Sequence, residues 1–250
     1  MTQPISQRVL HPRTNLPLTL REAGEGRPVW VLHGGGGPAM VDPIIDHFAA
    51  DHRVLAPTLP GWDGTPRPDR LRSVGDLADV YLDVLAELGL TGVTVVGSSF
   101  GGWVATEMAV RDTAGRLDHL VLIDAMGPVI PGHELTAPTS GPPEDGSPPQ
   151  ARRGPSDAEI ARLVAYTGPT MQDPALFGRL AEVRVPVLGL WGEHDPVTPL
   201  AYGRAFTDAF AVSRFLVIPD AGHLPTHEAP DLTFAAIDGF LRPQRSGWAA

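Results

Sequence analysis

The sequence contains no cysteine, no long apolar run and no block of concentrated basic residues. Without cysteine the chain can form no disulfide, no thiolate nucleophile and no cysteine-ligated metal site. No apolar run approaches the roughly 18 residues of a membrane-spanning helix, and the first residues lack the apolar segment of a signal peptide. The formal net charge is −10, from 19 basic and 29 acidic residues, which argues against nucleic acid as a partner. We therefore expect a cytoplasmic protein that binds neither nucleic acid nor a membrane, and the sequence leaves its oligomeric state open.

What is present is an ordinary globular composition, with 42% hydrophobic and 19% charged residues in a chain of 250. Short apolar runs alternate with segments of helical periodicity. This alternation predicts an α/β fold, in which helices cover both faces of a mostly parallel sheet. The predicted strands cover residues 16–21, 29–32, 53–57, 93–96, 117–123, 185–191 and 215–218. The predicted helices cover residues 40–50, 73–88, 101–111, 156–166, 173–180, 200–210 and 232–241.

One region interrupts this alternation. Residues 131–156 are dominated by Pro, Gly, Ser and Thr, a composition that buries too little apolar area to form regular structure. Two predicted helices then complete an insert of about fifty residues between two strands. We therefore divide the chain into a core domain, residues 1–126 and 183–250, and a cap or lid insert, residues 127–182. A plain surface loop is the alternative interpretation of the insert.

A run of four glycines follows the second apolar strand, in the stretch "HGGGG" of residues 33–37. Glycines at a strand end let backbone N–H groups approach a negative group, either a permanent phosphate or a charge that forms during a reaction. The spacing Gly34-x-Gly36-x-x-Ala39 fits a loose dinucleotide-binding pattern. That fold expects an acidic residue about twenty positions later, at the end of the next strand. Here that strand reads "RVLAPTLPG" and offers none, which disfavours a dinucleotide-dependent oxidoreductase.

The second glycine motif is "GSSFG", residues 97–101, between a predicted strand and a predicted helix. It fits the pattern G-x-S-x-G in strand-turn-helix context, which places Ser99 on a sharp turn above the sheet. The flanking glycines keep Cβ atoms out of a crowded bend. The N-terminus of the following helix favours negative charge beside the turn. Ser99 is therefore the candidate nucleophile, and Ser98 occupies the variable position of the motif.

A serine nucleophile needs a general base and an acid that orients the base. Asp195 follows the strand at residues 185–191, and His223 follows the strand at residues 215–218. The carboxyl ends of parallel strands are where open α/β sheets place their sites, so these groups are expected to meet Ser99. Asp124, at the end of the strand at residues 117–123, is an alternative acid. His223 and His227 together form only a weak metal-binding pattern, because no third ligand accompanies them.

These pieces resemble the α/β-hydrolase fold superfamily over essentially the whole chain. The resemblance rests on "HGGGG", "LPGWDGTPRP", "VVGSSFGGW", "LWGEHDPVTP" and "AGHLPTHE". It implies Ser99 as nucleophile, His223 as general base and acid, and Asp195 as the orienting carboxylate. It also implies an oxyanion hole formed by the N–H groups of Gly35 and Phe100, with no cofactor and no metal. His33 is expected to brace the glycine loop.

A serine nucleophile in this superfamily implies acyl transfer, that is, hydrolysis of a carboxylic ester, thioester or lactone of a small, apolar substrate. A carbon–carbon bond hydrolase of diketone-type compounds is an alternative. Two departures disfavour it, because chains of that type often carry Asn at the position of Ser98 and Trp at that of Leu224. A ligand-binding protein with little turnover is a further alternative. The candidate pocket residues beside these motifs are Gly34, Gly36, Met40, Trp103, Met126 and Trp191.

Overall fold

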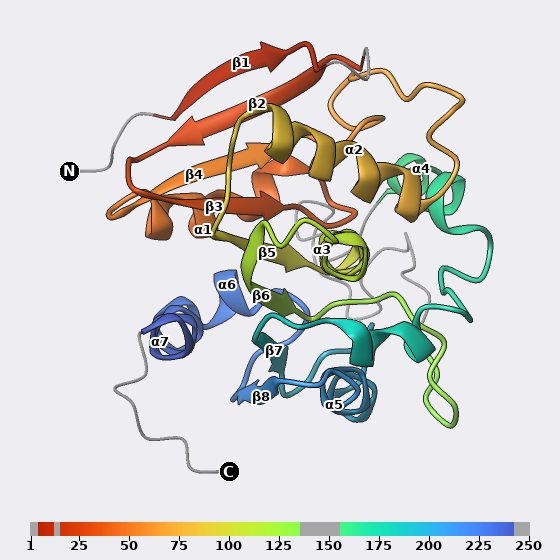
Figure 1. Cartoon of the computed structure of the whole chain (residues 1–250). Helices are drawn as coiled ribbons and strands as arrows, with labels where there is room; N and C mark the ends of the chain where they lie inside the picture. The colour runs from red at the N-terminus through yellow and green to blue at the C-terminus, as the bar shows by residue number, and fades with distance from the viewer. Residues whose placement is uncertain (1–4, 13–15, 136–155, 243–250) are drawn as a thin grey trace.

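The computed structural model describes residues 5–12, 16–135 and 156–242 (Figure 1). Eight strands form one sheet in the order β1-β2-β4-β3-β5-β6-β7-β8. The β1–β2 and β2–β4 pairs are antiparallel, and every pair from β4 to β8 is parallel, which confirms the predicted mostly parallel sheet. The strands are β1 (Ser6–Leu10), β2 (Leu18–Ala23), β3 (Arg27–Leu32), β4 (His52–Pro57), β5 (Val93–Ser98), β6 (Leu117–Ile123), β7 (Val187–Gly192) and β8 (Ser213–Ile218).

Helices cover both faces of the sheet (Figure 1). One apolar core lies between the sheet and helices α2, α3 and α5, and a second lies between the sheet and helices α1 and α7. Strands β5, β6 and β7 are almost entirely buried because both of their faces are covered. The helices of these two layers are α1 (Asp42–Phe48), α2 (Val74–Glu87), α3 (Phe100–Arg111), α5 (Leu200–Asp208), α6 (Pro225–Glu228) and α7 (Pro230–Leu241).

Local sequence explains where helix α2 begins. The Ser73 side chain accepts a hydrogen bond from the Asp76 N–H, and the Asp76 carboxylate accepts one from the Ser73 N–H, which forms a capping box. The apolar residues of α2 then recur at helical spacing and face the first core. Among the described residues, no helix is both long enough and apolar enough to cross a membrane.

The predicted helix at residues 173–180 is wrong. Asp173 forms a parallel β-bridge with Pro128, in which the Asp173 N–H donates to the Gly127 carbonyl and the Val129 N–H donates to the Asp173 carbonyl. These bonds commit the Asp173 backbone to an extended contact, so a helix cannot begin there. A short 3₁₀ helix, η3 (Phe177–Glu182), follows instead. Another 3₁₀ helix, η1 (Pro38–Val41), forms the start of the predicted helix at residues 40–50.

The insert contains helix α4 (Asp157–Thr167), close to its predicted position, with a capping box between Ser156 and Glu159. Most of the proline-rich segment predicted to lack regular structure, residues 136–155, lies outside the described residues. Strand β1 was not predicted, because four of its five residues are exposed and it lacks the alternation of a half-buried strand.

Candidate active site

Ser99 lies at the turn between strand β5 and helix α3, with backbone angles of φ 51° and ψ −116°. A left-handed φ is costly for a residue with a side chain, so surrounding contacts must hold it. The Ser99 N–H donates to the Ile123 carbonyl (2.9 Å), and the Ser99 carbonyl accepts from the N–H groups of Gly102 (3.0 Å) and Met126 (3.3 Å). The turn is therefore fixed by strand β6 and the segment after it as well as by its own helix.

The two glycines that flank Ser99 are required by close backbone contacts. A Cβ on Gly97 would overlap the Gly101 carbonyl, and a Cβ on Gly101 would overlap the Leu32 carbonyl. Helix α3 can approach strands β3 and β5 this closely only because both positions lack a side chain. This contact is the physical reason for the glycines of the G-x-S-x-G pattern.

His223 lies between Ser99 and Asp195, as the sequence predicts. Its Nε2 is 3.0 Å from Ser99 Oγ, and its Nδ1 is 2.8 Å from Asp195 Oδ2. The Asp195 side chain is fully buried, whereas that of His223 is 20% exposed. A carboxylate at Nδ1 keeps a proton on that nitrogen and leaves Nε2 free to accept the hydroxyl proton of Ser99.

The Asp195 carboxylate is held by donors from its own loop as well. Its Oδ1 accepts from the N–H groups of Val197 (2.7 Å) and Thr198 (3.1 Å), and its Oδ2 accepts from Thr198 Oγ1 (2.5 Å). Burial opposes ionisation of Asp195, but the His223 ring, Thr198 and Val197 together hold its pKa below the ordinary value. Asp195 is therefore the ionised partner of His223.

Asp124, the alternative acid, is not the hydrogen-bond partner of His223, whose two ring nitrogens are bonded to Asp195 and Ser99. It is completely buried, and its Oδ1 accepts from the Gly192 N–H (2.9 Å) at the end of strand β7. Burial and the neighbouring Asp195 charge raise the pKa of Asp124 well above its usual value. Asp195 therefore carries the negative charge next to the histidine.

The loops that carry Asp195 and His223 are bonded to each other. The Glu193 N–H donates to the Ile218 carbonyl (3.0 Å), and the His194 N–H donates to the Ala221 carbonyl (2.8 Å). A Cβ on Gly192 would overlap the Gly222 carbonyl, so the two loops meet backbone to backbone. This packing fixes the distance between the acid and the base.

The glycine loop passes directly beside Ser99. A Cβ on Gly34 would stand 3.0 Å from Ser99 Cβ. The Gly34 carbonyl accepts from His33 Nδ1 (2.8 Å), and the Gly35 carbonyl accepts from Trp62 Nε1 (2.9 Å). Because a trans peptide points its N–H away from its C=O, these bonds fix the direction of the Gly35 and Gly36 N–H groups.

His33 braces this loop, as predicted. Its Nε2 accepts from the Leu59 N–H (3.0 Å) while its Nδ1 donates to the Gly34 carbonyl, which requires the neutral ring. Complete burial lowers the pKa of His33 to about 3, so the ring is uncharged at neutral pH. Phe100 is the first residue of helix α3, and the N–H at that position has no acceptor within a helix.

Helix α4 of the insert packs on the glycine loop. Leu163 lies against Gly35, at 2.8 Å from its Cδ1 to an ideal Cβ on that glycine. Tyr166 Oη donates to the Pro60 carbonyl (3.0 Å), and Arg67 donates to the Ala165 carbonyl (2.6 Å). The Arg67 guanidinium also lies over the Tyr166 ring, 4.5 Å from its centroid. The insert is thus attached to the core beside the Ser99 turn.

The candidate pocket residues differ in their placement. Met40 lies against Gly36, whose Cβ would stand 3.0 Å from Met40 Cγ. Met126 is bonded through its N–H to the Ser99 carbonyl. Trp191 is fully buried, and its Nε1 donates to Thr198, so it supports the loop of Asp195 from the core. Trp191 is therefore a core residue, whereas Met40 and Met126 lie beside the site.

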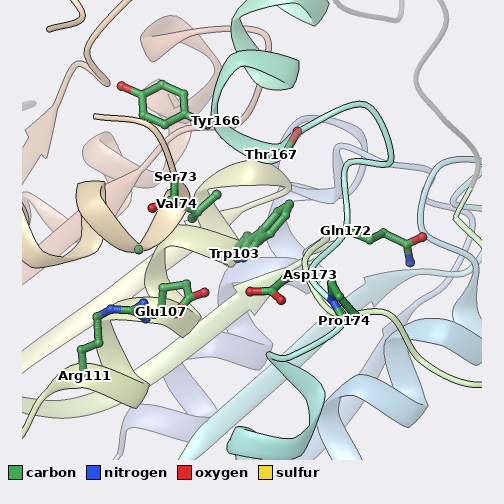
Figure 2. A pocket seen from close by; sticks show the side chains of 11 residues that line it. Ser73, Val74, Trp103, Glu107, Arg111, Tyr166, Thr167, Gln172, Asp173 and Pro174 are labelled. Atoms are coloured by element: carbon green, nitrogen blue, oxygen red, sulfur yellow. Dashed lines mark hydrogen bonds and ion pairs between the residues drawn. The ribbon is translucent and has the colours of Figure 1, made fainter. Parts of the chain in front are cut away.

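Trp103 lines a separate cavity of about 280 Å³ between helix α2, helix α3 and the insert. Figure 2 shows Trp103 in the middle of this cavity, with Glu107 and Arg111 further along α3. The buried Glu107 carboxylate pairs with Arg111 and lies 3.6 Å from Arg179. Ser99, His223 and Asp195 do not line this cavity. Trp103 of helix α3 therefore lines a cavity that is distinct from the candidate active site.

Within the described part of the chain, one group of side chains has the spacing of metal ligands: Glu193, His194 and Asp220, all exposed. The weak pattern of His223 and His227 is not a ligand pair here. His223 binds Ser99 and Asp195, and His227 Nε2 lies 2.9 Å from the Met40 carbonyl.

Sequence reasoning missed Thr198 and the α4 residues Leu163 and Tyr166. The hydrogen bond of Thr198 could have been predicted from the local sequence, since a hydroxyl three residues after an aspartate can bond back to it. The contacts of α4 could not, because Tyr166 and Pro60 are 106 positions apart.

Residues 31–236 match the alpha/beta hydrolase family, and the chain belongs to that family. A 2-hydroxy-6-oxo-6-(2'-aminophenyl)hexa-2,4-dienoic acid hydrolase of Metapseudomonas resinovorans is 28% identical over 88% of this chain and 86% of its own. A pimeloyl-[acyl-carrier protein] methyl ester esterase of Legionella pneumophila is 22% identical over 89% of this chain and 98% of its own.

Among solved structures, a thermophilic esterase from Thermogutta terrifontis superimposes with a TM-score of 0.75. It is 25% identical and the match covers 95% of this chain and 98% of the esterase. The similar proteins thus include a hydrolase of a dienoic acid and esterases, so membership of the family defines a hydrolase without selecting the bond that is cleaved.

Proposed function

We propose that this protein is a serine hydrolase that cleaves a carboxylic ester, thioester or lactone of a small, apolar substrate. The observation that carries the proposal is the chain of contacts from Ser99 Oγ through His223 to Asp195, at 3.0 Å and 2.8 Å. A hydroxyl, an imidazole and an ionised carboxylate in this order form a nucleophile, a base and an orienting acid.

In the proposed reaction, Ser99 Oγ attacks the substrate carbonyl while His223 Nε2 takes the hydroxyl proton. The imidazolium that forms is stabilised by the ionised Asp195 at Nδ1. Collapse of the tetrahedral intermediate breaks the bond to the leaving alcohol or thiol, and His223 returns the proton to it. Water then attacks the acyl-enzyme by the same route and releases the acid.

The negative oxygen of the intermediate needs preorganised donors. Gly35 and Phe100 are the proposed donors. The Gly35 N–H has its direction fixed by the bond from His33 to the Gly34 carbonyl, and the Phe100 N–H lies at the free start of helix α3. The glycine run therefore serves an anion that exists only during the reaction.

We assign residues 127–182 to a cap over this site. The support is the packing of helix α4 on the core. Leu163 lies against Gly35 of the glycine loop, and Tyr166 Oη donates to the Pro60 carbonyl. The side chains that flank the glycines, Leu163 and Met40, are apolar, which favours an apolar acyl group.

Hydrolysis of a carbon–carbon bond is the second candidate. The dienoic acid hydrolase of Metapseudomonas resinovorans, similar over most of both chains, favours it. The same three side chains serve both reactions, so the position of Ser99 does not distinguish them. Ser98 and Leu224 remain the two departures that favour the ester.

Labelling with a fluorophosphonate probe tests the nucleophile. The unmodified chain and a Ser98→Ala variant are expected to label, and Ser99→Ala is not. Ser98 is the matched control because it is the neighbouring serine in the same turn. Labelling that survives in Ser99→Ala would contradict the assignment.

Substrate assays then separate the two reactions. Nitrophenyl esters of increasing acyl length are expected to turn over in a manner that depends on Ser99, whereas a 2-hydroxy-6-oxo-hexadienoate is expected to be cleaved slowly or not at all. A reversed preference would favour the carbon–carbon candidate. Probe labelling without turnover of either substrate would favour a binding protein.

A further inference from the structure

Asp124 is a buried carboxyl group that the proposed reaction does not use. It follows strand β6 with a left-handed φ of 45° and is completely buried. Its N–H donates to the Leu190 carbonyl (3.0 Å), which ties it to the neighbouring strand β7. The residue before it, Ile123, accepts the Ser99 N–H. Asp124 thus lies on the segment that also fixes the nucleophile turn.

The two oxygens of Asp124 have different surroundings. Oδ1 accepts from the Gly192 N–H (2.9 Å), and the Gly192 carbonyl in turn accepts from the Asp195 N–H (3.3 Å). Oδ2 is buried, and within the described residues no protein donor bonds to it. A buried carboxylate oxygen without a donor is costly, whereas the O–H of a carboxylic acid needs only an acceptor.

The acceptor beside Asp124 is Asp195, whose side chain interacts with it directly. Two adjacent buried carboxyl groups cannot both ionise cheaply. Asp195 has donors for both oxygens, from Val197, Thr198 and His223, and therefore keeps the charge. The proton then belongs on Asp124. Glu228 of α6 is a further charged group that acts on Asp124, and it also disfavours ionisation.

We propose that Asp124 is a positioning residue for the proposed triad: it remains a carboxylic acid and donates a hydrogen bond from Oδ2 to the Asp195 carboxylate. Through Oδ1 it also holds the Gly192 peptide, which bonds to the Asp195 backbone. Asp124 acts through Asp195 and does not touch the substrate. This inference rests on the proposed function, since it assigns Asp195 as the acid partner of His223.

A protonated Asp124 differs from an ionised one in two measurable ways. Its carboxyl group keeps the C=O stretch of a carboxylic acid, which an ionised carboxylate lacks. It also donates to Asp195, so a side chain that can donate in its place should preserve the position of Asp195, and one that cannot donate should not.

The test of protonation is infrared difference spectroscopy at neutral pH between the unmodified chain and Asp124→Asn, Asp124→Ala and Asp124→Leu. The unmodified chain is expected to show a carboxylic acid band that all three variants lose. The Leu variant fills the space if the Ala variant fails to fold. Absence of an acid band that depends on Asp124 would overturn the proposal, because Asp124 would then be ionised.

Ester turnover gives a second readout. An Asn amide can donate to Asp195 and accept from Gly192, so Asp124→Asn should keep most of the rate. Ala and Leu cannot donate, and these variants should lower kcat about tenfold with KM nearly unchanged. An equal loss in all three variants, or no loss in Ala and Leu, would overturn the proposal by showing that the donor to Asp195 is not needed.

The two proposals fail in different ways. The infrared spectrum needs no turnover, so it decides whether Asp124 is protonated even if the chain hydrolyses no ester. Failure of Ser99 to react with the fluorophosphonate would contradict the proposed function alone. A loss of several orders of magnitude in Asp124→Asn, with Asp195→Asn nearly unaffected, would show that Asp124 is itself the triad acid.

Discussion

Leu163 of the insert lies against Gly35 of the glycine loop, so close that an ideal Cβ on Gly35 would stand 2.8 Å from Leu163 Cδ1. The two residues are far apart in the sequence, yet the contact places an apolar side chain of the insert beside a proposed oxyanion donor. The acyl group of a substrate would have to fit next to this side chain. Leu163 is therefore expected to limit the length of the acyl chain.

The variant Leu163→Ala should widen the site on the acyl side. Because room for one further methylene is worth roughly 1–3 kcal/mol in an apolar pocket, kcat/KM for an octanoate ester relative to a butanoate ester should rise about tenfold or more. The measurement is a series of nitrophenyl esters. Val164→Ala is the matched control, since Val164 is the next residue of the same helix and only partly buried. If both variants changed this ratio of kcat/KM equally, Leu163 would not be the residue that limits the acyl chain.

The glycine after the nucleophile should tolerate no side chain. A Cβ on Gly101 would overlap the Leu32 carbonyl, and backbone cannot move aside as a flexible side chain can. Gly101→Ala is therefore expected to give little or no folded protein. Gly239, in helix α7, has nothing within 4 Å of an ideal Cβ, so Gly239→Ala should stabilise the chain by up to about 1 kcal/mol. Urea unfolding followed by circular dichroism compares the two variants.

The motif glycines, Gly97 and Gly101, also show which part of the candidate site could be predicted from the sequence. The pattern G-x-S-x-G encodes a local geometry, so the turn, Ser99 and the adjacent strand and helix could be predicted from a few residues. Asp195 and His223 could be placed because parallel strands end at one edge of a sheet. The raised pKa of Asp124 could not be predicted, since it depends on complete burial and on Asp195, a carboxyl group 71 positions further along the chain.

Elements whose structure depends on distant contacts were harder to predict. Residues 173–180 have local helical character, but the bridge from Asp173 to Pro128 replaces the first turn. Strand β1 has little apolar pattern of its own and is held by pairing with β2. The placement of α4 on the glycine loop follows from contacts with Pro60 and Arg67, which no local pattern records.

The stability of the fold should fall on acidification partly because of His33. Burial lowers the pKa of His33 to about 3 in the folded chain, against an ordinary value of 6.5. Between these values the unfolded chain binds a proton that the folded chain does not, so the free energy of unfolding decreases as the pH falls below about 6.5. From pH 7 to pH 5 this one group should cost about 2 kcal/mol.

Urea unfolding at pH 7 and pH 5 measures this contribution. His33→Gln keeps an amide next to Leu59 but does not titrate, so its free energy of unfolding should decrease by about 2 kcal/mol less over the same interval. The matched control is His194→Gln, because the His194 side chain is largely exposed. A pH dependence in His33→Gln equal to that of the unmodified chain would show that His33 is not the titrating group.

Thr198 is expected to contribute to turnover through Asp195. Its Oγ1 donates to Asp195 Oδ2 at 2.5 Å, on the oxygen that also accepts from His223. Thr198→Val keeps the shape and removes the donor, and a hydrogen bond to a charged group is worth roughly 1.5–3 kcal/mol. We expect kcat to fall about tenfold or more with KM nearly unchanged, in steady-state assays with a nitrophenyl ester.

The control for Thr198 is another buried threonine with a hydroxyl hydrogen bond. Thr207 of helix α5 donates to the Gly203 carbonyl (2.8 Å) and lies away from Asp195. Thr207→Val should change stability but leave kcat close to that of the unmodified chain. If both variants lowered kcat equally, the effect of Thr198 would be one of general packing.

Arg67 is expected to stabilise the packing of helix α4 against the core. Its guanidinium donates to the Ala165 carbonyl and lies over the Tyr166 ring, so one side chain holds two consecutive residues of the helix. Arg67→Met keeps most of the aliphatic length and removes both interactions. A cation–π contact and a hydrogen bond at a partly exposed site contribute about 1–2 kcal/mol together. The amides of α4 should then exchange with solvent about tenfold faster, while those of the buried strand β5 keep their rates.

Hydrogen exchange followed by mass spectrometry resolves these segments. Arg204→Met is the matched control, because the Arg204 guanidinium lies over the Phe215 ring at 4.6 Å and joins helix α5 to strand β8. It should accelerate exchange near α5 and β8 and leave α4 unchanged. If Arg67→Met accelerated exchange throughout the core, the residue would stabilise the whole fold. If it left α4 unchanged, the contacts of Leu163 and Tyr166 alone would hold the insert on the glycine loop.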